Sequence, residues 1–353
     1  DGLVNENTTL SNFTITNGGS DEHSKGGGIR CRTNTNLENL IITNNTSRSG
    51  AGIYLQNSID GLRPSPMVNN VIVENNIAIE HSGGISANYS SPIINNSIIR
   101  NNIANSGGGG LRLNESSAII KNTLISGNSS EAQGGGIYFY SQSNQYEHES
   151  AQLINVTIVN NETTTGETEQ NADGGYFGGG IFCRYGSSPI ITNSIIYNNF
   201  PQSIMFQPTG GGYGQSSVTI NYSNIEGGED GIVTEVYDGD DAIIYWNQGS
   251  IDLNPEFNED FTLQPTSPCI DAGDPESDPD PDGTRADMGA YPYDQIANPI
   301  IYGCTNPDAS NYDEMANVDD GSCCIELWGE CYNIEETEIL NLRWSNLSGE
   351  IPS

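Results

Sequence analysis

The chain has 353 residues, with 46 acidic side chains against 11 basic ones and a formal net charge of −35. So few Lys and Arg residues argue against a nucleic-acid partner, because phosphate binding needs basic side chains that displace counterions, and they disfavour an anionic membrane surface. The sequence has no run of about 18 apolar residues, so we expect no membrane-spanning segment.

Two short motifs alternate along the first two thirds of the chain. The first reads apolar-x-Asn-x-apolar-apolar-x-Asn-Asn and occurs at residues 37–45, 68–76, 94–102 and 191–199, with looser copies around Asn12, Asn122 and Asn155. The second is Gly-Gly-Gly-Ile or a close variant, at residues 26–29, 50–53, 82–85, 107–111, 134–137 and 178–181, and loosely at 210–213. Internal repetition of this kind is typical of solenoid architectures.

The repeat predicts an all-β solenoid. Equivalent positions such as Ile85, Leu111 and Ile137 are 26 residues apart, and no apolar stripe with helical spacing lasts for three turns. Two or three short strands joined by Gly and Asn turns would form one coil of a parallel β-helix. We expect the Ile and Val columns to fill the interior.

The asparagines are expected to have two structural roles. The first Asn of each motif is predicted to point inward and form an amide ladder between coils. These residues are Asn39, Asn70, Asn96, Asn122, Asn155 and Asn193. The Asn pair that ends each motif is predicted to form the turns, where Asn tolerates left-handed backbone.

The alternation resembles the right-handed parallel β-helix repeats of secreted bacterial surface proteins, including polymorphic outer-membrane-type adhesins and pectate-lyase-like folds, over residues 1–290. Enzymes of that shape have clustered carboxylates with an Arg or Lys base, or paired Asp with His, and neither pattern is found here. His23, His81 and His148 are interpreted as solvated loop residues, and the pair Asp240 and Asp241 as a polar turn. The resemblance therefore implies a scaffold, and we lean against an enzyme.

Insertions interrupt the repeat after Asn57, Ser141 and Asn161. Insertions in solenoids often carry function. The last of them, which contains Tyr176 and Phe177, is the first place to look for a binding site on the β-helix, with a solvated loop as the alternative.

The seven cysteines fall into two groups. Cys31 and Cys183 occupy an interior apolar column, and Cys269 is interpreted in the same way, so all three are expected to be free and buried. Cys304, Cys323, Cys324 and Cys331 crowd a segment too small to bury a core, where disulfides are the usual remedy in an oxidising compartment. Four cysteines allow three pairings. The most economical one joins Cys304 to Cys323 and Cys324 to Cys331.

Alternating aspartates precede a glycine near the end of the β-helix. Asp278, Asp280 and Asp282 come before Gly283, and Asp287 follows. This order is similar to the first half of a calcium loop, although the usual final Glu is replaced by Gly289. Calcium is the one cofactor that the sequence predicts, with a solvated acidic turn as the alternative.

Three further pieces follow the β-helix. After a linker at residues 291–302, residues 303–323 resemble Cys-bounded, Asp-rich repeats of bacterial surface proteins, with Asp308, Asp313, Asp319 and Asp320 as further candidate calcium ligands. Residues 324–353 are similar to the start of a leucine-rich repeat domain, through Leu340, Leu342 and the run from Leu347 to Pro352. One such repeat cannot bury its apolar face alone, so we expect the native protein to continue.

The leading hypothesis is a secreted or cell-surface structural and adhesive protein that binds glycans or other surface components. Asn-X-Ser/Thr sites, among them Asn45, Asn128 and Asn161, would carry glycans if the protein passed through a glycosylating pathway. A polysaccharide-active lyase or hydrolase of the pectate-lyase-like fold is the second hypothesis. A filament that assembles through open β-helix ends is the third.

Overall fold

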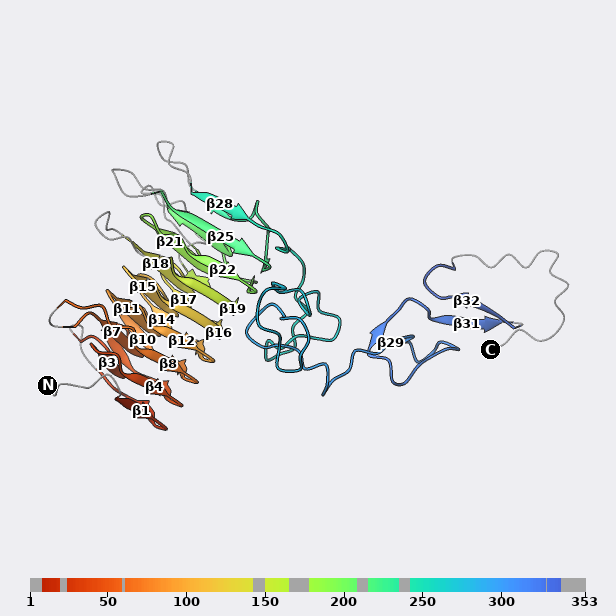
Figure 1. Cartoon of the computed structure of the whole chain (residues 1–353), viewed down its shortest axis with the longest axis horizontal. Helices are drawn as coiled ribbons and strands as arrows, with labels where there is room; N and C mark the ends of the chain where they lie inside the picture. The colour runs from red at the N-terminus through yellow and green to blue at the C-terminus, as the bar shows by residue number, and fades with distance from the viewer. Residues whose placement is uncertain are drawn as a thin grey trace.

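The computed structural model describes residues 8–19, 24–58, 61–141, 150–164, 178–207, 215–234, 242–327 and 329–337. Within these ranges the chain forms 32 strands and no α-helix, and therefore no helix that could span a membrane. The predicted all-β solenoid is confirmed, because strands from successive coils pair in parallel along its whole length (Figure 1). The expected 26-residue period is also confirmed by the register of Ile85, Leu111 and Ile137.

Three parallel sheets form the sides of the solenoid. The first sheet has two columns of strands. Its first column contains β1 (Thr9–Ser11), β4 (Asn36–Glu38), β8 (Met67–Asn69), β12 (Ile93–Asn95), β16 (Ile119–Ser126), β19 (Gln152–Val159), β22 (Ile190–Thr192), β25 (Ser217–Asn221) and β28 (Ile243–Trp246). Its second column contains β2 (Thr14–Thr16), β5 (Ile41–Thr43), β9 (Ile72–Glu74), β13 (Ile98–Arg100), the ends of β16 and β19, β23 (Ile195–Tyr197) and β26 (Asn224–Ile225).

The other two sheets complete each coil. The second sheet contains β6 (Thr46–Ser49), β10 (Ile77–His81), β14 (Ile103–Ala104), β17 (Ser129–Ser130) and β20 (Glu162–Thr163). The third contains β3 (Ile29–Cys31), β7 (Ile53–Gln56), β11 (Ile85–Asn88), β15 (Leu111–Asn114), β18 (Ile137–Tyr140), β21 (Ile181–Arg184), β24 (Ile204–Gln207) and β27 (Val233–Thr234).

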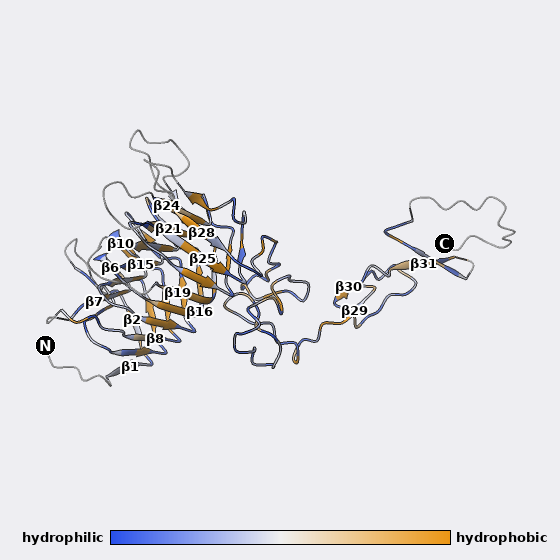
Figure 2. Cartoon of the chain, turned by 45° about the horizontal axis from the view of Figure 1, so that its top comes forward, coloured by the Kyte–Doolittle hydropathy of each residue, from blue (hydrophilic) through white to orange (hydrophobic). Residues whose placement is uncertain are grey.

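The core is a set of apolar columns that run along the solenoid axis. Side chains alternate between the two faces of a strand, so one residue in two points inward and stacks on its register partner. Val73, Ile99, Ile125 and Ile158 form one such column, and each is fully buried. Figure 2 shows the apolar residues gathered on the strands, for example on β16, β19 and β25. Cys31 and Cys183 lie in an interior column and are free, as predicted.

An asparagine ladder crosses the interior, but it is built from different residues than the sequence suggested. From Asn76 onward, each ladder Asn accepts, through Oδ1, hydrogen bonds from the main-chain N–H and the Nδ2 of the ladder Asn in the preceding coil, at 2.9–3.1 Å. The first, Asn45, accepts from Gly18 N at 2.8 Å. The Nδ2 of each ladder Asn also donates to a carbonyl of the preceding coil, such as Val73 O for Asn102. The ladder residues are Asn45, Asn76, Asn102, Asn128, Asn161 and Asn199, all buried.

The predicted ladder of first asparagines is therefore wrong. Asn39, Asn70, Asn96, Asn122, Asn155 and Asn193 have left-handed backbone, with φ between 46 and 54°. They form turns, and the first four are exposed. The amide of Asn70 does donate to Asn39 Oδ1 at 2.7 Å, as an inter-coil bond, but at the surface and not in the interior. The first Asn of each motif and the ladder Asn at its end both lie at bends of the chain, and both form hydrogen bonds through the side-chain amide. Residue type alone therefore did not distinguish the outward bend from the inward one.

The coils end at β28, and the chain then folds back along their side. Residues 247–297, which we name the closing segment, pack on the outside of the first sheet near β16, β19 and β23 (Figure 1). Met288, Leu263 and Cys269 cover Ile195, and Ala290 N donates to Thr157 Oγ1 at 2.9 Å. The division into a β-helix to residue 290 and a linker over 291–302 stays a prediction.

Two disulfides stabilise the C-terminal region. They join Cys304 to Cys323 and Cys324 to Cys331, the pairing that the sequence favoured. The first closes a loop whose ends pair through β29 (Tyr302–Gly303) and β30 (Val318–Asp319), and the second closes the hairpin of β31 (Cys324–Leu327) and β32 (Glu330–Asn333). The residues that carry the leucine-rich repeat motif, from Leu340 onward, lie outside the described residues.

The ladder predicts a large difference between adjacent asparagines. Asn102→Ala leaves the main-chain N–H of Asn76 buried without its acceptor and removes the Nδ2 donor that Val73 O and Asn128 Oδ1 accept from, so we expect the free energy of unfolding to fall by about 2–4 kcal/mol. Asn101 is exposed and has φ 53°, and Asn101→Gly should change the free energy by no more than about 0.5 kcal/mol. Urea denaturation of both variants measures this, and equal losses would contradict the assignment of the ladder.

Candidate functional site

The outward columns of the third sheet carry basic and aromatic side chains. In each strand the first and third residues point inward, as Leu111 and Leu113 do, so the second and fourth point outward. The outward second positions are Arg30, Tyr54, Ser86, Arg112, Tyr138 and Phe182, and the fourth positions include Gln56, Asn88, Asn114, Tyr140 and Arg184. We name Lys25, Arg30, Tyr54, Arg112, Tyr140, Arg184 and Tyr185 the third-sheet face.

Arg112 lies near the middle of this face, beside the rings of Tyr138 and Tyr140 on the neighbouring strand β18. Its Cζ lies 5.7 Å from the ring centroid of Tyr138 and 5.4 Å from that of Tyr140, distances at which a cation is attracted to the ring. Its Nε is buried and has no hydrogen-bond partner. Burial lowers the pKa of the Arg112 guanidinium, but an arginine stays protonated in proteins. Arg112 is thus a partly buried cation without a counter-charge among the described residues.

The same pairing of cation and ring recurs on both sides of Arg112. The Cζ of Arg184 lies 4.3 Å from the Tyr185 ring centroid and 5.9 Å from that of Tyr140. Tyr140 and Tyr185 pack edge to face, with centroids 5.2 Å apart. Toward the N-terminal coils, Lys25 Nζ donates to the Tyr54 hydroxyl at 3.2 Å and lies 5.1 Å from the ring centroid.

The ion pairs of the described ranges lie elsewhere. They join Arg48 to Glu80 on the second sheet and Arg100 to Glu74 on the first, each at 2.7 Å. No described carboxylate forms an ion pair with Lys25, Arg30, Arg112 or Arg184. Among the described residues, the third-sheet face therefore carries basic side chains that no carboxylate pairs with.

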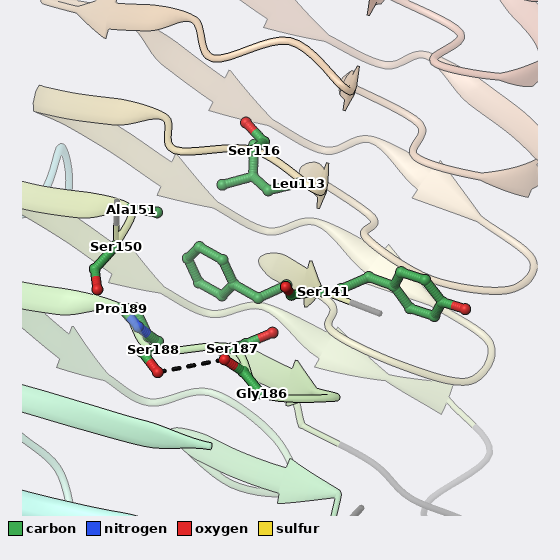
Figure 3. Close-up of a pocket in the computed structure, with 11 residues that line it drawn as sticks. Leu113, Ser116, Ser141, Ser150, Ala151, Gly186, Ser187, Ser188 and Pro189 are labelled. Carbon is green, nitrogen blue, oxygen red and sulfur yellow. Dashed lines mark hydrogen bonds between the residues drawn. The ribbon is translucent and has the colours of Figure 1, made fainter. Parts of the chain in front are cut away.

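A pocket of about 150 Å³ adjoins the third-sheet face at Tyr140 (Figure 3). It lies at the corner where the strands of the third sheet lead into the first. Its apolar lining includes Leu113, Phe139 and Pro189, and its polar lining is Ser116, Ser141, Ser150, Ser187 and Ser188. The Oγ of Ser116 is buried and has no hydrogen-bond partner. The pocket therefore offers an apolar floor with hydroxyl groups around it.

His81 lies beside Arg112 and differs from the prediction of a solvated loop residue. It ends β10, and its Nδ1 is buried without a hydrogen-bond partner. Burial, followed by the positive charge of Arg112, lowers the pKa of His81 to about 4. The imidazole is therefore neutral at pH 7, so it adds no cation to this face. His23, His148, Asp240, Asp241, Tyr176 and Phe177 lie outside the described residues.

The predicted calcium aspartates lie in the closing segment, where main-chain N–H groups donate to three of them. Asp287 accepts from Asp271 N at 2.6 Å and from Tyr293 N at 2.7 Å. Asp280 accepts from Asp287 N and Asp282 from Thr284 N, whereas Asp278 is exposed. Burial raises the pKa of Asp287 to about 7.

No group of three or more His, Cys, Asp or Glu side chains in the described ranges is arranged to hold a metal ion. Calcium at Asp278, Asp280, Asp282 and Asp287 stays a prediction. In the disulfide-closed loop, Asp313 and Asp319 accept from the main-chain N–H groups of Met315 and Gly321, as in short Asx turns.

Comparison with known proteins supports the fold. Residues 95–239, which run from the end of β12 to just beyond β27, match the family model described as a right handed beta helix region. No curated protein and no solved structure matches the chain. The fold is therefore a right-handed parallel β-helix, whereas the chemistry of the third-sheet face must be read from its own side chains.

The neutral His81 predicts a specific pH dependence of stability. Its pKa is about 4 in the folded state, against an ordinary value of 6.5 for a solvated histidine, so between these values the unfolded chain binds the proton and the folded chain does not. Stability therefore rises with pH across this window and is lost on acidification, by about 2 kcal/mol between pH 7 and pH 4 after allowance for partial exposure.

His81→Phe keeps a ring in this place and removes the titration. We expect the difference in urea midpoint between pH 7 and pH 4.5 to become smaller in this variant than in the parent protein. Equal pH slopes for the two proteins would show that His81 is not the group responsible.

Proposed function

We propose that this protein is an extracellular surface protein whose β-helix binds acidic glycans along the third-sheet face. The observation that carries the proposal is the state of Arg112, a partly buried guanidinium beside two tyrosine rings with no described carboxylate paired to it. Leaving a charge without a partner is costly. A ligand carboxylate or sulfate at Arg112 would offset this cost with charge-assisted hydrogen bonds.

The aromatic residues suit a sugar backbone. Tyr140 and Tyr185 are rigid, flat side chains that pack edge to face, each with a hydroxyl at the edge of its ring. Such side chains give contact area to the apolar face of a ring and a polar group to its substituents, and they lose little conformational entropy on binding. Cations set among such rings favour a sugar with an acidic group over a neutral one.

The length of the face favours a polymer over a single sugar. From Arg30 on β3 to Arg184 on β21 the third sheet takes five inter-strand steps, which is about 24 Å at the usual strand spacing. The pocket below Tyr140 could accept one side group or one end of the chain, through Ser116 and the neighbouring hydroxyls.

The location and the adhesive role belong to the same proposal. Two disulfides between residues 304 and 331 support an oxidising compartment. A long solenoid that aligns basic and aromatic side chains along one sheet is suited to holding a polyanionic chain at a surface. The second hypothesis, a polysaccharide-active enzyme, is the alternative, and release of shortened chains from the same ligands would favour it.

Arg112→Gln tests the proposal against a matched control. We expect the variant to bind polygalacturonate or a sulfated galactan about 10- to 100-fold more weakly, as loss of a charge-assisted contact implies. Arg48→Gln makes the same change of charge on the second sheet, where Arg48 pairs with Glu80, and should bind like the parent protein. Binding is measured by isothermal titration calorimetry, with unchanged melting temperatures as the check on folding.

Two outcomes would reject the proposal. One is that the parent protein binds acidic glycans no better than a neutral glucan or mannan. The other is that Arg48→Gln weakens binding as much as Arg112→Gln does, because the effect would then reflect overall charge and not this face.

A further inference from the structure

A second cleft lies on another side of the molecule, where the closing segment meets the first sheet. Its volume is about 490 Å³. We name it the lateral cleft and define it by Ile98, Leu124, Gly127, Asp260, Phe261 and Tyr291, which are among its lining residues. It belongs to the outside of the second strand column and shares no lining residue with the third-sheet face.

One glycine keeps the lateral cleft open. The turn that precedes each ladder asparagine has a left-handed residue, and this residue is Asn in the other coils, as at Asn75, Asn101 and Asn160. In one coil it is Gly127, with φ 61°. A Cβ at Gly127 would lie 2.6 Å from Asn101 Oδ1, the end of a flexible exposed side chain. A side chain here would extend into the cleft, and its absence leaves room for a ligand.

The floor and one wall of the cleft are apolar. Ile98 and Leu124 are register partners on β13 and β16 and form the floor. Phe261 and Tyr291 come from the closing segment, and Phe261 is held edge to face against Phe257, with centroids 5.9 Å apart. Burial raises the pKa of Tyr291, so its ring is neutral and attractive to a cation.

The charge at the rim of the cleft is negative. Glu259 and Asp260 are exposed there. Asp260 Oδ1 accepts from Thr262 N at 3.2 Å and from Thr262 Oγ1 at 2.6 Å, and these bonds lower the pKa of Asp260 and keep it ionised. The one basic residue in the lining, Arg100, is neutralised by Glu74 at 2.7 Å. The two acids therefore face a cleft without a free cation among its described residues.

We propose that the lateral cleft binds an organic cation, an ammonium or guanidinium on an aliphatic stem, with the stem on Ile98 and Leu124 and the charged end between Asp260 and the rings of Phe261 and Tyr291. Aromatic faces with a nearby carboxylate are the arrangement that recognises such cations. The site is independent of the third-sheet face, so either can fail without the other.

The test compares n-pentylamine with n-pentanol, which has the same stem without the charge. We expect the amine to bind about tenfold more tightly at low salt, measured by chemical-shift titration on the full chain. Asp260→Asn should weaken amine binding about fivefold and leave pentanol unchanged. Asp230→Asn makes the same change of charge at an exposed site outside the cleft and should leave both unchanged.

Gly127→Asn tests the cleft itself. Asn is the residue at this turn in the other coils, so the variant should fold with an unchanged melting temperature. We expect it to lose binding of both probes. Unchanged amine binding in Gly127→Asn, or equal weakening by Asp230→Asn and Asp260→Asn, would overturn the proposal, because the amine would then be held only by the overall negative charge.

A short peptide identifies the source of the cation. If acetyl-Gly-Lys-Gly-amide binds at least as tightly as pentylamine, the ligand is a basic side chain of a protein, and if only the free amine binds, it is a small amine. Both results support the cation site, and binding of neither probe would reject it.

Discussion

The register between successive coils is the constraint on which the rest of this structure depends. A hydrogen-bonded network in the interior is most useful when every member is satisfied, because one unpaired buried group costs as much as several good contacts contribute. The ladder from Asn45 to Asn199 meets this condition over six coils. The ladder fixes which residue of one coil lies above which residue of the next. It therefore also fixes which side chains share each column of the core and each column on the outside of the sheets. Arg112 lies beside Tyr138 because Asn102 lies beside Asn128.

Among the described residues, the molecule separates its charges by face. Its acids outnumber its bases fourfold, yet Lys25, Arg30, Arg112 and Arg184 lie on one side of one sheet without a described carboxylate as partner. The lateral cleft has the opposite arrangement, since its one arginine is already paired and its rim is acidic. A solenoid makes this separation simple, because a column of outward positions can change character without affecting the core. Two ligands of opposite charge could therefore be held on one rigid body.

Much of the fold was predictable from the sequence, because it follows from periodicity. The alternation of Asn and Gly motifs predicted the parallel coils, the interior position of Cys31 and Cys183 and the 26-residue repeat. The inner ladder was assigned to the wrong asparagines, since two bends in each coil use the same residue. The third-sheet face was missed, although its signal was present. Arg30, Tyr54 and Arg112 each directly follow the last residue of a Gly-Gly-Gly-Ile motif or its equivalent. The lateral cleft was not predictable, because residues 127 and 261 meet only when the closing segment folds back.

The inner ladder also restricts how this protein can be made. Asn45, Asn128 and Asn161 are each followed by the X-Ser/Thr pattern that glycan transfer requires, and all three are fully buried. Where glycans are attached to a nascent chain before it folds, these three side chains would be blocked, and no coil could close around them. The protein can reach this fold only if these asparagines stay unmodified. For production in a host that glycosylates secreted proteins, the threonine or serine two residues later should be replaced, and the ladder asparagine kept.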